Sequence, residues 1–296
     1  AAIKDDNEEM IEAKKNNIPM MERGEFLGEI TKLYSNTIGI AGTHGKTSTT
    51  SMVSLIFLEA GRDPTIQVGS ILSNINGNYR VGKSDTLIIE ACEYCDSFLS
   101  FKQKSAIILN IDNDHLDYFK NLENIKKSFN KYVSHLPNDG YLVINNDDKN
   151  SSELKDNTSA KVVTYGINND SDYMAKDINN STFIVENNKI TSPINNTAFI
   201  YNSLVAYVVG KLCNISIPNI QKGIKTNEFT SNRLEFKKTK NGVTIIDDTY
   251  NSSLDAIKSS LEILEKEPSK RKIAVVGDIL EVGDYNKEIH ENIGKL

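Results

Sequence analysis

The run Thr37-Ile38-Gly39-Ile40-Ala41 leads directly into Gly42-Thr43-His44-Gly45-Lys46-Thr47. The first run is short and apolar, a pattern that predicts a buried strand. Residues 46–60 then place apolar side chains at helical spacing, and Gly61 is typical of the residue that ends a helix. A strand, a glycine-rich turn and a helix in this order form the context that a phosphate-binding loop needs.

The turn carries the groups that such a loop uses. Glycines let backbone N–H groups approach phosphate oxygens, the helix N-terminus adds positive potential, and Lys46 adds a point charge. The Thr47 hydroxyl would bind Mg²⁺. The strict Walker pattern places four residues between its first glycine and the Gly-Lys pair, and that first position falls on Ile40, so this loop is a variant. An ordinary Gly- and Thr-rich turn is the alternative, but the coincidence of all these features favours phosphate binding.

Two polar side chains follow other predicted strands. Glu90 ends the run at 86–90, and His115 follows the run at 105–111. Ligands of open α/β sheets bind at the carboxyl ends of the strands, so Thr47, Glu90 and His115 could converge on metal and phosphate. Glu90 offers the hard oxygen that Mg²⁺ prefers, whereas His115 would suit a two-metal or phosphate-rich site. From spacing alone, a solvated polar residue at a strand end remains the alternative for each.

The rest of the chain alternates short apolar runs with amphipathic segments, which favours an α/β fold with a parallel sheet. Further strands are predicted at 141–145, 162–165 and 183–185, and helices at 7–16, 122–135 and 201–212. A second unit is predicted to begin near Thr230. Its runs 234–238 and 243–247 flank Asn241-Gly242, a strong hairpin signal. A helix at 254–265, a strand at 272–276 and a helix from about 286 follow.

Composition narrows the function classes. The 296 residues include 34 Lys and Arg and 40 Asp and Glu, a net charge of −6, which argues against a general nucleic-acid binder. No run reaches the roughly 18–20 apolar residues of a membrane span, so no membrane insertion is expected. Three cysteines cannot build a disulfide framework, which fits a reducing cytosol. Cys92-Glu93-Tyr94-Cys95 has redox or zinc spacing, but no second pair or nearby His completes a zinc site, so a functional thiol is disfavoured.

Several ordered motifs together resemble the Mur ligase family, the ATP-dependent amino-acid ligases of peptidoglycan precursor synthesis. They are Ala41-Gly42-Thr43-His44-Gly45-Lys46-Thr47-Ser48-Thr49-Thr50, Glu90-Ala91-Cys92-Glu93, Asn110-Ile111-Asp112-Asn113-Asp114-His115-Leu116-Asp117 and Asp247-Asp248-Thr249-Tyr250-Asn251. The resemblance covers nearly the whole chain. Residues 1–150 look most like the members that add L-alanine to UDP-N-acetylmuramate. The segments 247–251 and 275–283 look more like the members that add D-alanyl-D-alanine.

The resemblance implies a cytoplasmic ATP-dependent ligase that joins L-alanine to UDP-N-acetylmuramate through an acyl phosphate. A D-alanyl-D-alanine-adding ligase and a non-catalytic nucleotide-binding fragment are the alternatives. The implied cofactors are ATP and Mg²⁺. The implied partners are UDP-N-acetylmuramate and an amino acid or dipeptide, with no nucleic acid. The sequence leaves the oligomeric state open.

The resemblance also implies roles for individual residues. Lys46, Glu90 and His115 would be catalytic, with Lys46 on the β- and γ-phosphates. Thr47 and Glu90 would hold one Mg²⁺ and His115 a second. The implied nucleotide-binding residues are Gly42, Thr43, His44, Gly45, Lys46, Thr47, Ser48, Asn202 at the adenine, Arg233 at the γ-phosphate and Asp248 at the ribose.

Some positions depart from the family pattern. Asn196-Thr197-Ala198-Phe199 replaces the family's Gly-x-His-Asn lead to the helix that carries Asn202, and Asn232 stands where Gly usually precedes Arg233. A carbamylated lysine of several members matches Phe129 here, as in the alanine-adding type.

The resemblance divides the chain into three parts. Residues 1–36 are expected to be a remnant of an N-terminal UDP-binding domain, 37–228 a central P-loop-type ATPase domain with a parallel sheet, and 229–296 the start of a Rossmann-like domain. The central domain would thus be flanked by two partial Rossmann-like domains. Because Ala1 stands where an initiator Met would, the chain is expected to begin inside a larger protein and to be truncated at both ends. A chain of this extent is expected to bind nucleotide poorly and to lack ligase activity.

Overall fold

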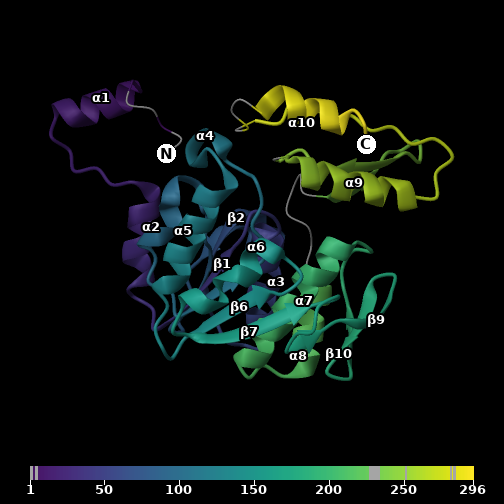
Figure 1. The fold of residues 1–296 in the computed structure, drawn as a ribbon, viewed down its shortest axis with the longest axis horizontal. Helices are drawn as coiled ribbons and strands as arrows, with labels where there is room; N and C mark the ends of the chain where they lie inside the picture. Colours follow the sequence, from purple (N-terminus) through teal and green to yellow (C-terminus); the bar gives the residue numbers. More distant parts are fainter. Residues whose placement is uncertain (1–2, 4–5, 227–233, 251, 281, 283–284) are drawn as a thin grey trace.

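The computed structural model describes residues 3, 6–226, 234–250, 252–280, 282 and 285–296. Its main feature is an eight-stranded sheet in the order β3-β2-β4-β1-β5-β6-β7-β8 (Figure 1). The strands are β1 (Asn36–Ala41), β2 (Thr65–Leu72), β3 (Gly77–Arg80), β4 (Thr86–Glu90), β5 (Ser105–Ile108), β6 (Tyr141–Asn145), β7 (Lys161–Gly166) and β8 (Tyr173–Met174). All neighbours pair in parallel except β2 and β3.

The central strands are apolar on both sides because helices cover both faces of the sheet. Along β1, Ile38 and Ile40 belong to one core, while Ala41 belongs to the other. Along β4, Ile88 faces the first core and Ile89 the second. This alternation is the period-two arrangement of strand side chains, and it explains why each of these runs is almost wholly apolar.

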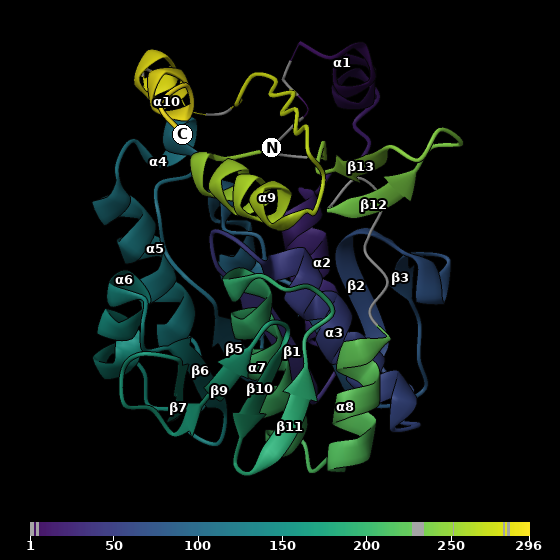
Figure 2. The ribbon, with the colours of Figure 1, turned by 90° about the vertical axis from the view of Figure 1, so that its right-hand side faces the viewer.

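Helices α3 (Lys46–Glu59), α7 (Thr197–Leu212) and α8 (Ile217–Lys225) cover the first face (Figure 2). Helices α3 and α8 approach closely at Gly223, where an added Cβ would lie 2.6 Å from the backbone of Ile56. An antiparallel sheet closes this side, made of β9 (Lys176–Asn179), β10 (Thr182–Val185) and β11 (Asn188–Thr191). Its Phe183 joins the same core.

The second face is covered by η2 (Tyr94–Ser100), α4 (Leu116–Phe119), α5 (Leu122–Ser134), α6 (Lys149–Ser152) and η3 (Glu153–Asn157). Helix α2 (Arg23–Thr31) packs on η2. The approach needs small residues, because a Cβ on Gly28 would lie 2.6 Å from the carbonyl oxygen of Ser100. Helix α1 (Glu8–Lys15) lies away from the sheet in Figure 1.

The C-terminal part forms a smaller unit beside the carboxyl ends of the main strands (Figures 1 and 2). It contains the hairpin β12 (Glu235–Lys238) and β13 (Thr244–Asp247), then α9 (Leu254–Lys266) and α10 (Asn286–Ile293). The hairpin prediction is confirmed, and Gly242 in its turn has φ +80°. The predicted strand at 272–276 is wrong: within the described residues this segment pairs with no other strand, and Val275 is 94% exposed.

The α/β fold with a parallel central sheet is confirmed, with differences at the element ends. The strand predicted at 105–111 ends at Ile108, because the next residues turn back onto the glycine-rich loop, where Thr43 N–H donates to the Asn110 carbonyl. The helix predicted at 201–212 already begins at Thr197, with Asn196 as its N-cap. The other predicted strands and helices form at their places.

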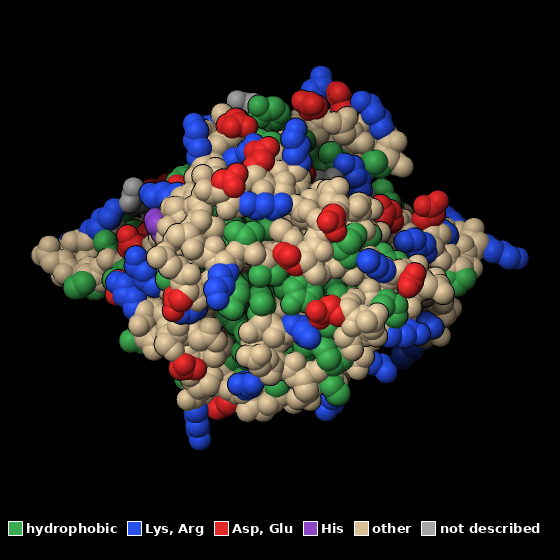
Figure 3. Space-filling model, turned by 60° about the horizontal axis from the view of Figure 1, so that its bottom comes forward, with side chains coloured by type: hydrophobic (Ala, Val, Ile, Leu, Met, Phe, Trp, Pro, Cys, Tyr) green, Lys and Arg blue, Asp and Glu red, His purple; other side chains and the backbone are tan. Residues whose placement is uncertain are grey.

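No helix in the described part of the chain is both long enough and apolar enough to cross a membrane. On the face that Figure 3 shows, positive and negative side chains are interspersed around green hydrophobic areas. No single sign of charge dominates that face.

Candidate functional site

A pocket of about 420 Å³ opens where the C-terminal unit meets the main sheet. Loop residues 43–47 form one wall, and Glu90, Asp114 and His115 also line it. Arg23 comes from α2, while the segment 250–256 contributes Tyr250 and the start of α9. Helix and strand ends far apart in the sequence thus meet at the edge of the sheet where the resemblance places the nucleotide.

The glycine-rich loop between β1 and α3 depends on glycine at two positions. Gly42 has φ +144°, and a Cβ there would lie 2.9 Å from the Cβ of Leu109. Gly45 has φ +83°, and its Cβ would lie 2.8 Å from Oδ1 of Asn202. Larger residues are therefore excluded by both backbone strain and contact.

Lys46 at the start of α3 is held by three acceptors. Its Nζ donates to the carbonyl oxygens of Gly42 (2.6 Å) and Thr43 (3.1 Å) and to Oε1 of Glu93 (2.9 Å). Burial opposes the charge, but the Glu93 carboxylate, together with Cys92 and Glu90, outweighs it and raises the pKa of Lys46 above its ordinary value. The side chain is therefore a fixed cation beside the loop.

Thr47 and Glu90 meet as predicted. The Thr47 hydroxyl donates to Oε1 of Glu90 at 3.2 Å, and the N–H of Gly69 donates to Oε2 at 2.7 Å. A Cβ on Gly69 would lie 2.5 Å from the carboxylate, so β2 approaches Glu90 closely only because this residue is glycine. Hydroxyl and carboxylate oxygens are the ligand types that Mg²⁺ takes, so this pair fits such an ion.

Asn110 holds the loop from the neighbouring strand end. Its Oδ1 accepts from the N–H of His44 (2.7 Å), and its Nδ2 donates to the His44 carbonyl (3.1 Å). Nearby, the N–H of Asp112 donates to the Thr43 hydroxyl at 2.9 Å. The sequence prediction did not name Asn110 as a site residue, although it belongs to the motif that contains His115.

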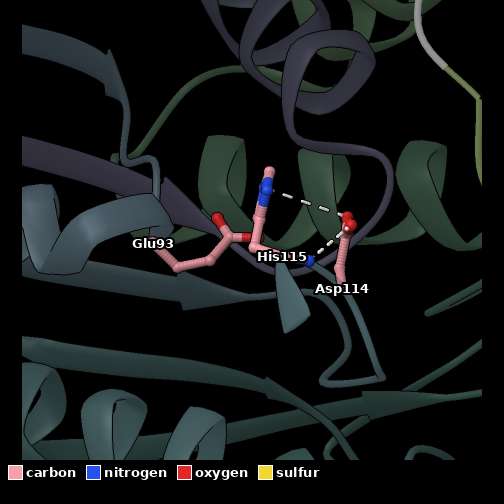
Figure 4. Close-up of side chains that lie close together, drawn as sticks. All are labelled: Glu93, Asp114 and His115. Atoms are coloured by element: carbon pink, nitrogen blue, oxygen red, sulfur yellow. Dashed lines mark hydrogen bonds and ion pairs between the residues drawn. The ribbon is translucent and has the colours of Figure 1, made fainter. Parts of the chain in front are cut away.

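His115 lies beside two carboxylates (Figure 4). Its φ of +49° is unusual for a residue other than glycine, and its ring stacks on Tyr94 with centroids 4.5 Å apart. Oδ1 of Asp114 accepts from the His115 N–H at 2.8 Å. Glu93, Asp114 and His115 each offer one atom that could bind a metal ion, and these three atoms lie within 4.8 Å of one another. The sequence prediction named only His115 of these three.

The remaining predicted residues lie at different distances from the pocket. Asn202 in α7 touches the loop at Gly45, and Ser48 lies in the first turn of α3, outside the lining of the described pocket. Asp248 accepts from the Leu234 N–H (3.2 Å) and the Ser260 hydroxyl (2.6 Å) of its own unit. Arg233 lies outside the described residues. All these roles stay predictions.

The cysteines are free thiols, namely Cys92, Cys95 and Cys213. Burial, and then the charge of Glu93, raises the pKa of the Cys92 thiol. A raised pKa leaves little of the reactive thiolate near neutral pH, which disfavours redox chemistry at this pair.

Phe129 is fully buried, and its ring meets that of Phe98 edge to face at 5.2 Å. It fills the core under η2 and offers no ligand atom.

Known families and proteins are similar to this chain over most of its length. The family model of the Mur ligase middle domain matches residues 40–210, and that of the Mur ligase, glutamate ligase domain matches 232–296. A UDP-N-acetylmuramate–L-alanine ligase of Clostridium botulinum strain Langeland is 43% identical over 284 residues, which are 93% of this chain and 62% of that relative. The chain therefore spans 62% of the length of this curated relative.

Two solved structures share the fold. The UDP-N-acetylmuramate-alanine ligase MurC of Thermotoga maritima superposes with a TM-score of 0.81, at 21% identity, over 99% of this chain and 73% of that chain. The MurF ligase of the same organism, solved in complex with ADP, superposes with a TM-score of 0.74 at 20% identity. The match covers 93% of this chain and 68% of that chain. Since the middle-domain model alone matches more than half of its residues, the chain belongs to the Mur ligase family.

Proposed function

We propose that this chain forms the ATP-binding part of a ligase that joins L-alanine to UDP-N-acetylmuramate in peptidoglycan precursor synthesis. The observation that carries the proposal is the constellation of loop, Lys46 and the Thr47–Glu90 pair in one pocket. The substrate assignment rests on the name of the C. botulinum relative at 43% identity.

The chemistry requires a carboxylate to be activated before an amine can attack it. ATP would transfer its γ-phosphoryl group to the carboxylate of the sugar nucleotide, which gives an acyl phosphate and ADP. The amine of L-alanine would then attack the acyl carbon, and phosphate would leave from the tetrahedral intermediate. Catalysis of this kind consists of positioning and charge neutralisation, because the bond changes themselves need little covalent help from the protein.

The chain's residues supply those two effects. N–H groups of the loop and the N-terminus of α3 would bind phosphate oxygens, and Lys46 would neutralise them. Thr47 and Glu90 would hold Mg²⁺, whose charge would offset that of the β- and γ-phosphates. His115, which lines the same pocket, would hold a second Mg²⁺. Asn202 beside Gly45 fits a nucleotide that extends along the loop, and the roles of Asp248 and Arg233 follow the family alone.

Two other assignments have support. The fold is shared with MurF, and the motifs at 247–251 and 275–283 resemble the D-alanyl-D-alanine-adding members, so this dipeptide is the second candidate acceptor. A nucleotide-binding unit without catalysis is the third.

Three free thiols are typical of a reducing compartment, which supports a cytoplasmic location.

One assay separates the three assignments. Phosphate release and the amide product are measured with Mg·ATP and UDP-N-acetylmuramate, using L-alanine or D-alanyl-D-alanine as the acceptor. In the full-length protein, we expect product with L-alanine alone and a loss of at least about 100-fold in Lys46→Ala, since one phosphate-binding group in such sites contributes several kcal/mol. Lys32→Ala, a surface change on the far end of α2, is the control.

Product with the dipeptide alone would replace the proposed acceptor. ATP binding by calorimetry that Lys46→Ala abolishes, without phosphate release with either acceptor, would leave the nucleotide-binding unit as the better assignment. No ATP binding at all would refute the assignment of the loop.

A further inference from the structure

We propose that Arg23, the first residue of α2, binds the carboxylate of the acid substrate in the pocket. The inference rests on the proposed function and deepens it, because that reaction joins two anionic groups and Lys46 serves only the phosphates. No motif in the sequence pointed to Arg23.

Two side chains that are positively charged at neutral pH, Arg23 and Lys46, line the described part of the pocket. They reach it from opposite faces of the main sheet, since α3 covers the first face and α2 packs on η2 over the second. One cation from each side fits two anions that must approach each other, because each positive charge offsets part of their repulsion.

The guanidinium of Arg23 is available to a ligand. The side chain is exposed, and among the described residues it makes no hydrogen bond or ion pair, whereas Lys46 is held by three acceptors. A guanidinium presents five N–H donors in one plane and can bind both oxygens of a carboxylate at once. Arg23 therefore has the donors that a carboxylate needs, and the described part of the chain uses none of them.

The position of Arg23 on its helix is unfavourable without a ligand. The N-terminus of an α-helix carries a partial positive charge, which repels a cation in the first turn. The neighbouring carboxylates of Glu22 and Glu25 form a capping box with the helix backbone, in which the Glu22 N–H donates to Oε2 of Glu25 at 3.1 Å. They cap the helix and do not pair with Arg23, so an anionic ligand would supply the partner that this cation lacks.

The backbone that carries Arg23 is held in place by close packing on η2. A Cβ on Gly24 would lie 2.9 Å from the Cβ of Ser97, and one on Gly28 would lie 2.6 Å from the carbonyl oxygen of Ser100. The start of α2 therefore cannot leave the pocket without losing this contact. A binding group on a rigid element loses less conformational freedom when its ligand arrives.

The carboxylate of the acid substrate is the anion that fits this cation. The loop, Lys46 and an ion at the Thr47–Glu90 pair would neutralise the phosphates. A carboxylate that enters the same pocket meets the negative charges of Glu90 and Asp114, which also line it. Like charges at short range repel each other, and Arg23 offsets that repulsion.

The experiment compares two ligands that differ in one charge. UDP-N-acetylmuramate, or the analogue whose carboxylate is replaced by a carboxamide, is titrated by calorimetry into the full-length protein with Mg²⁺ and a non-hydrolysable ATP analogue. We expect the unchanged protein to bind the acid at least about 10-fold more tightly than the carboxamide, because the amide cannot make the charge-assisted contact. Arg23→Ala should remove this preference, and Arg23→Lys should keep part of it.

Lys32→Ala is the matched control, since it removes one positive charge from the other end of α2 and should bind both ligands as the unchanged protein does. In Arg23→Ala, the affinity for the ATP analogue and the KM of L-alanine should stay within about 2-fold of their values in the unchanged protein, because the proposed contact involves neither ligand.

Four results would overturn the inference. They are equal affinities of the unchanged protein for acid and carboxamide, an Arg23→Ala variant that still prefers the acid, and equal weakening of both ligands in that variant, which would mean that Arg23 only supports the fold. The fourth is a raised KM for L-alanine with unchanged affinity for the acid, which would assign Arg23 to the carboxylate of the amino acid. No product from the unchanged protein with either acceptor would refute the proposed function, whereas product formation with a retained acid preference in Arg23→Ala would refute this inference alone.

Discussion

Asn110 is a single side chain on which the shape of the loop depends. It makes two hydrogen bonds to the backbone of His44, one as acceptor and one as donor. We expect Asn110→Ala to lower the free energy of unfolding by about 1–3 kcal/mol, because it leaves a partly buried N–H and carbonyl without their partners. Affinity for Mg·ATP, measured by calorimetry, should fall by about 10-fold or more, because the loop N–H groups lose their fixed orientation.

Asn113→Ala is the matched control, since Asn113 is exposed in the same segment. Asn110→Asp keeps the acceptor for His44 but replaces the donor with a charge, so it should weaken nucleotide binding further than alanine does. Equal affinity in Asn110→Ala and Asn113→Ala would show that the loop holds its shape without this clamp.

The sequence predicts best those residues whose role depends on near neighbours in the chain. Lys46 and Thr47 follow from the strand, the glycines and the helix around them. Glu93 and Asn110 were not named, because their partners Lys46 and His44 lie far away in the sequence and adjoin them only across neighbouring strands. The Gly69 contact with Glu90 likewise exists only once β2 lies beside β4.

At the scale of elements, Asp147 ties the end of β6 to the turn after β7. Its carboxylate accepts from the N–H groups of residues 167–169 and from the Tyr201 hydroxyl, the last at 2.7 Å. Burial raises the pKa of Asp147, but these donors outweigh it and hold the pKa below its ordinary value. We expect Asp147→Ala to cost about 2–3 kcal/mol of unfolding free energy near neutral pH.

The effect should depend on pH with a definite sign. A carboxyl group whose pKa is lower in the folded state stabilises the fold above its unfolded value, about 3.9, and loses that contribution as the pH falls through the folded value. Urea unfolding should therefore show a constant difference between the two proteins from neutral pH to about 5 and a narrowing one below about 4. Asp170→Ala, at an exposed neighbour, should show no such difference. A gap that stays constant into acid would contradict the role given to the charge.

Strands and helices were predicted correctly where a single pattern of apolar residues runs through the whole element. The strands β1, β4 and β6 are nearly continuous apolar runs, as expected for a sheet covered on both faces. Strand β2 was not predicted, because Gln67, Gly69 and Ser70 interrupt its apolar residues. Helix α2 contains two glycines that its packing on η2 requires, and they hide its helical pattern. The apolar run at 272–276 reads as a strand but has no partner strand among the described residues.

At the scale of the whole molecule, the pocket depends on contacts between the C-terminal unit and the main sheet. The order of the motifs in the sequence does not predict these contacts. The Tyr250 hydroxyl donates to the Gly69 carbonyl at 3.0 Å, and Nδ2 of Asn196 donates to the Ser259 hydroxyl at 3.1 Å. These contacts bring the start of α9 to the glycine-rich loop. The family resemblance predicted Asp248 as the nucleotide-binding residue of this unit. The residues that line the pocket from this side are instead Tyr250, Ser252, Ser253 and Ala256.

This arrangement predicts that one bound ligand reduces backbone motion in both the main sheet unit and the C-terminal unit. Ser253 caps α9, and the first turn of this helix lines the pocket, where the positive end of the helix dipole favours an anion. We expect Mg·ATP to slow amide hydrogen exchange at residues 254–257 as well as at 43–47, since a bound ligand restrains both walls. Helix α10 does not line the pocket, so its exchange should stay unchanged as an internal reference. Lys46→Ala should remove protection from both segments together, although it alters only the loop. Protection confined to 43–47 would mean instead that nucleotide binds to the central sheet alone, and that the contacts through Tyr250 and Asn196 serve only to pack the two units.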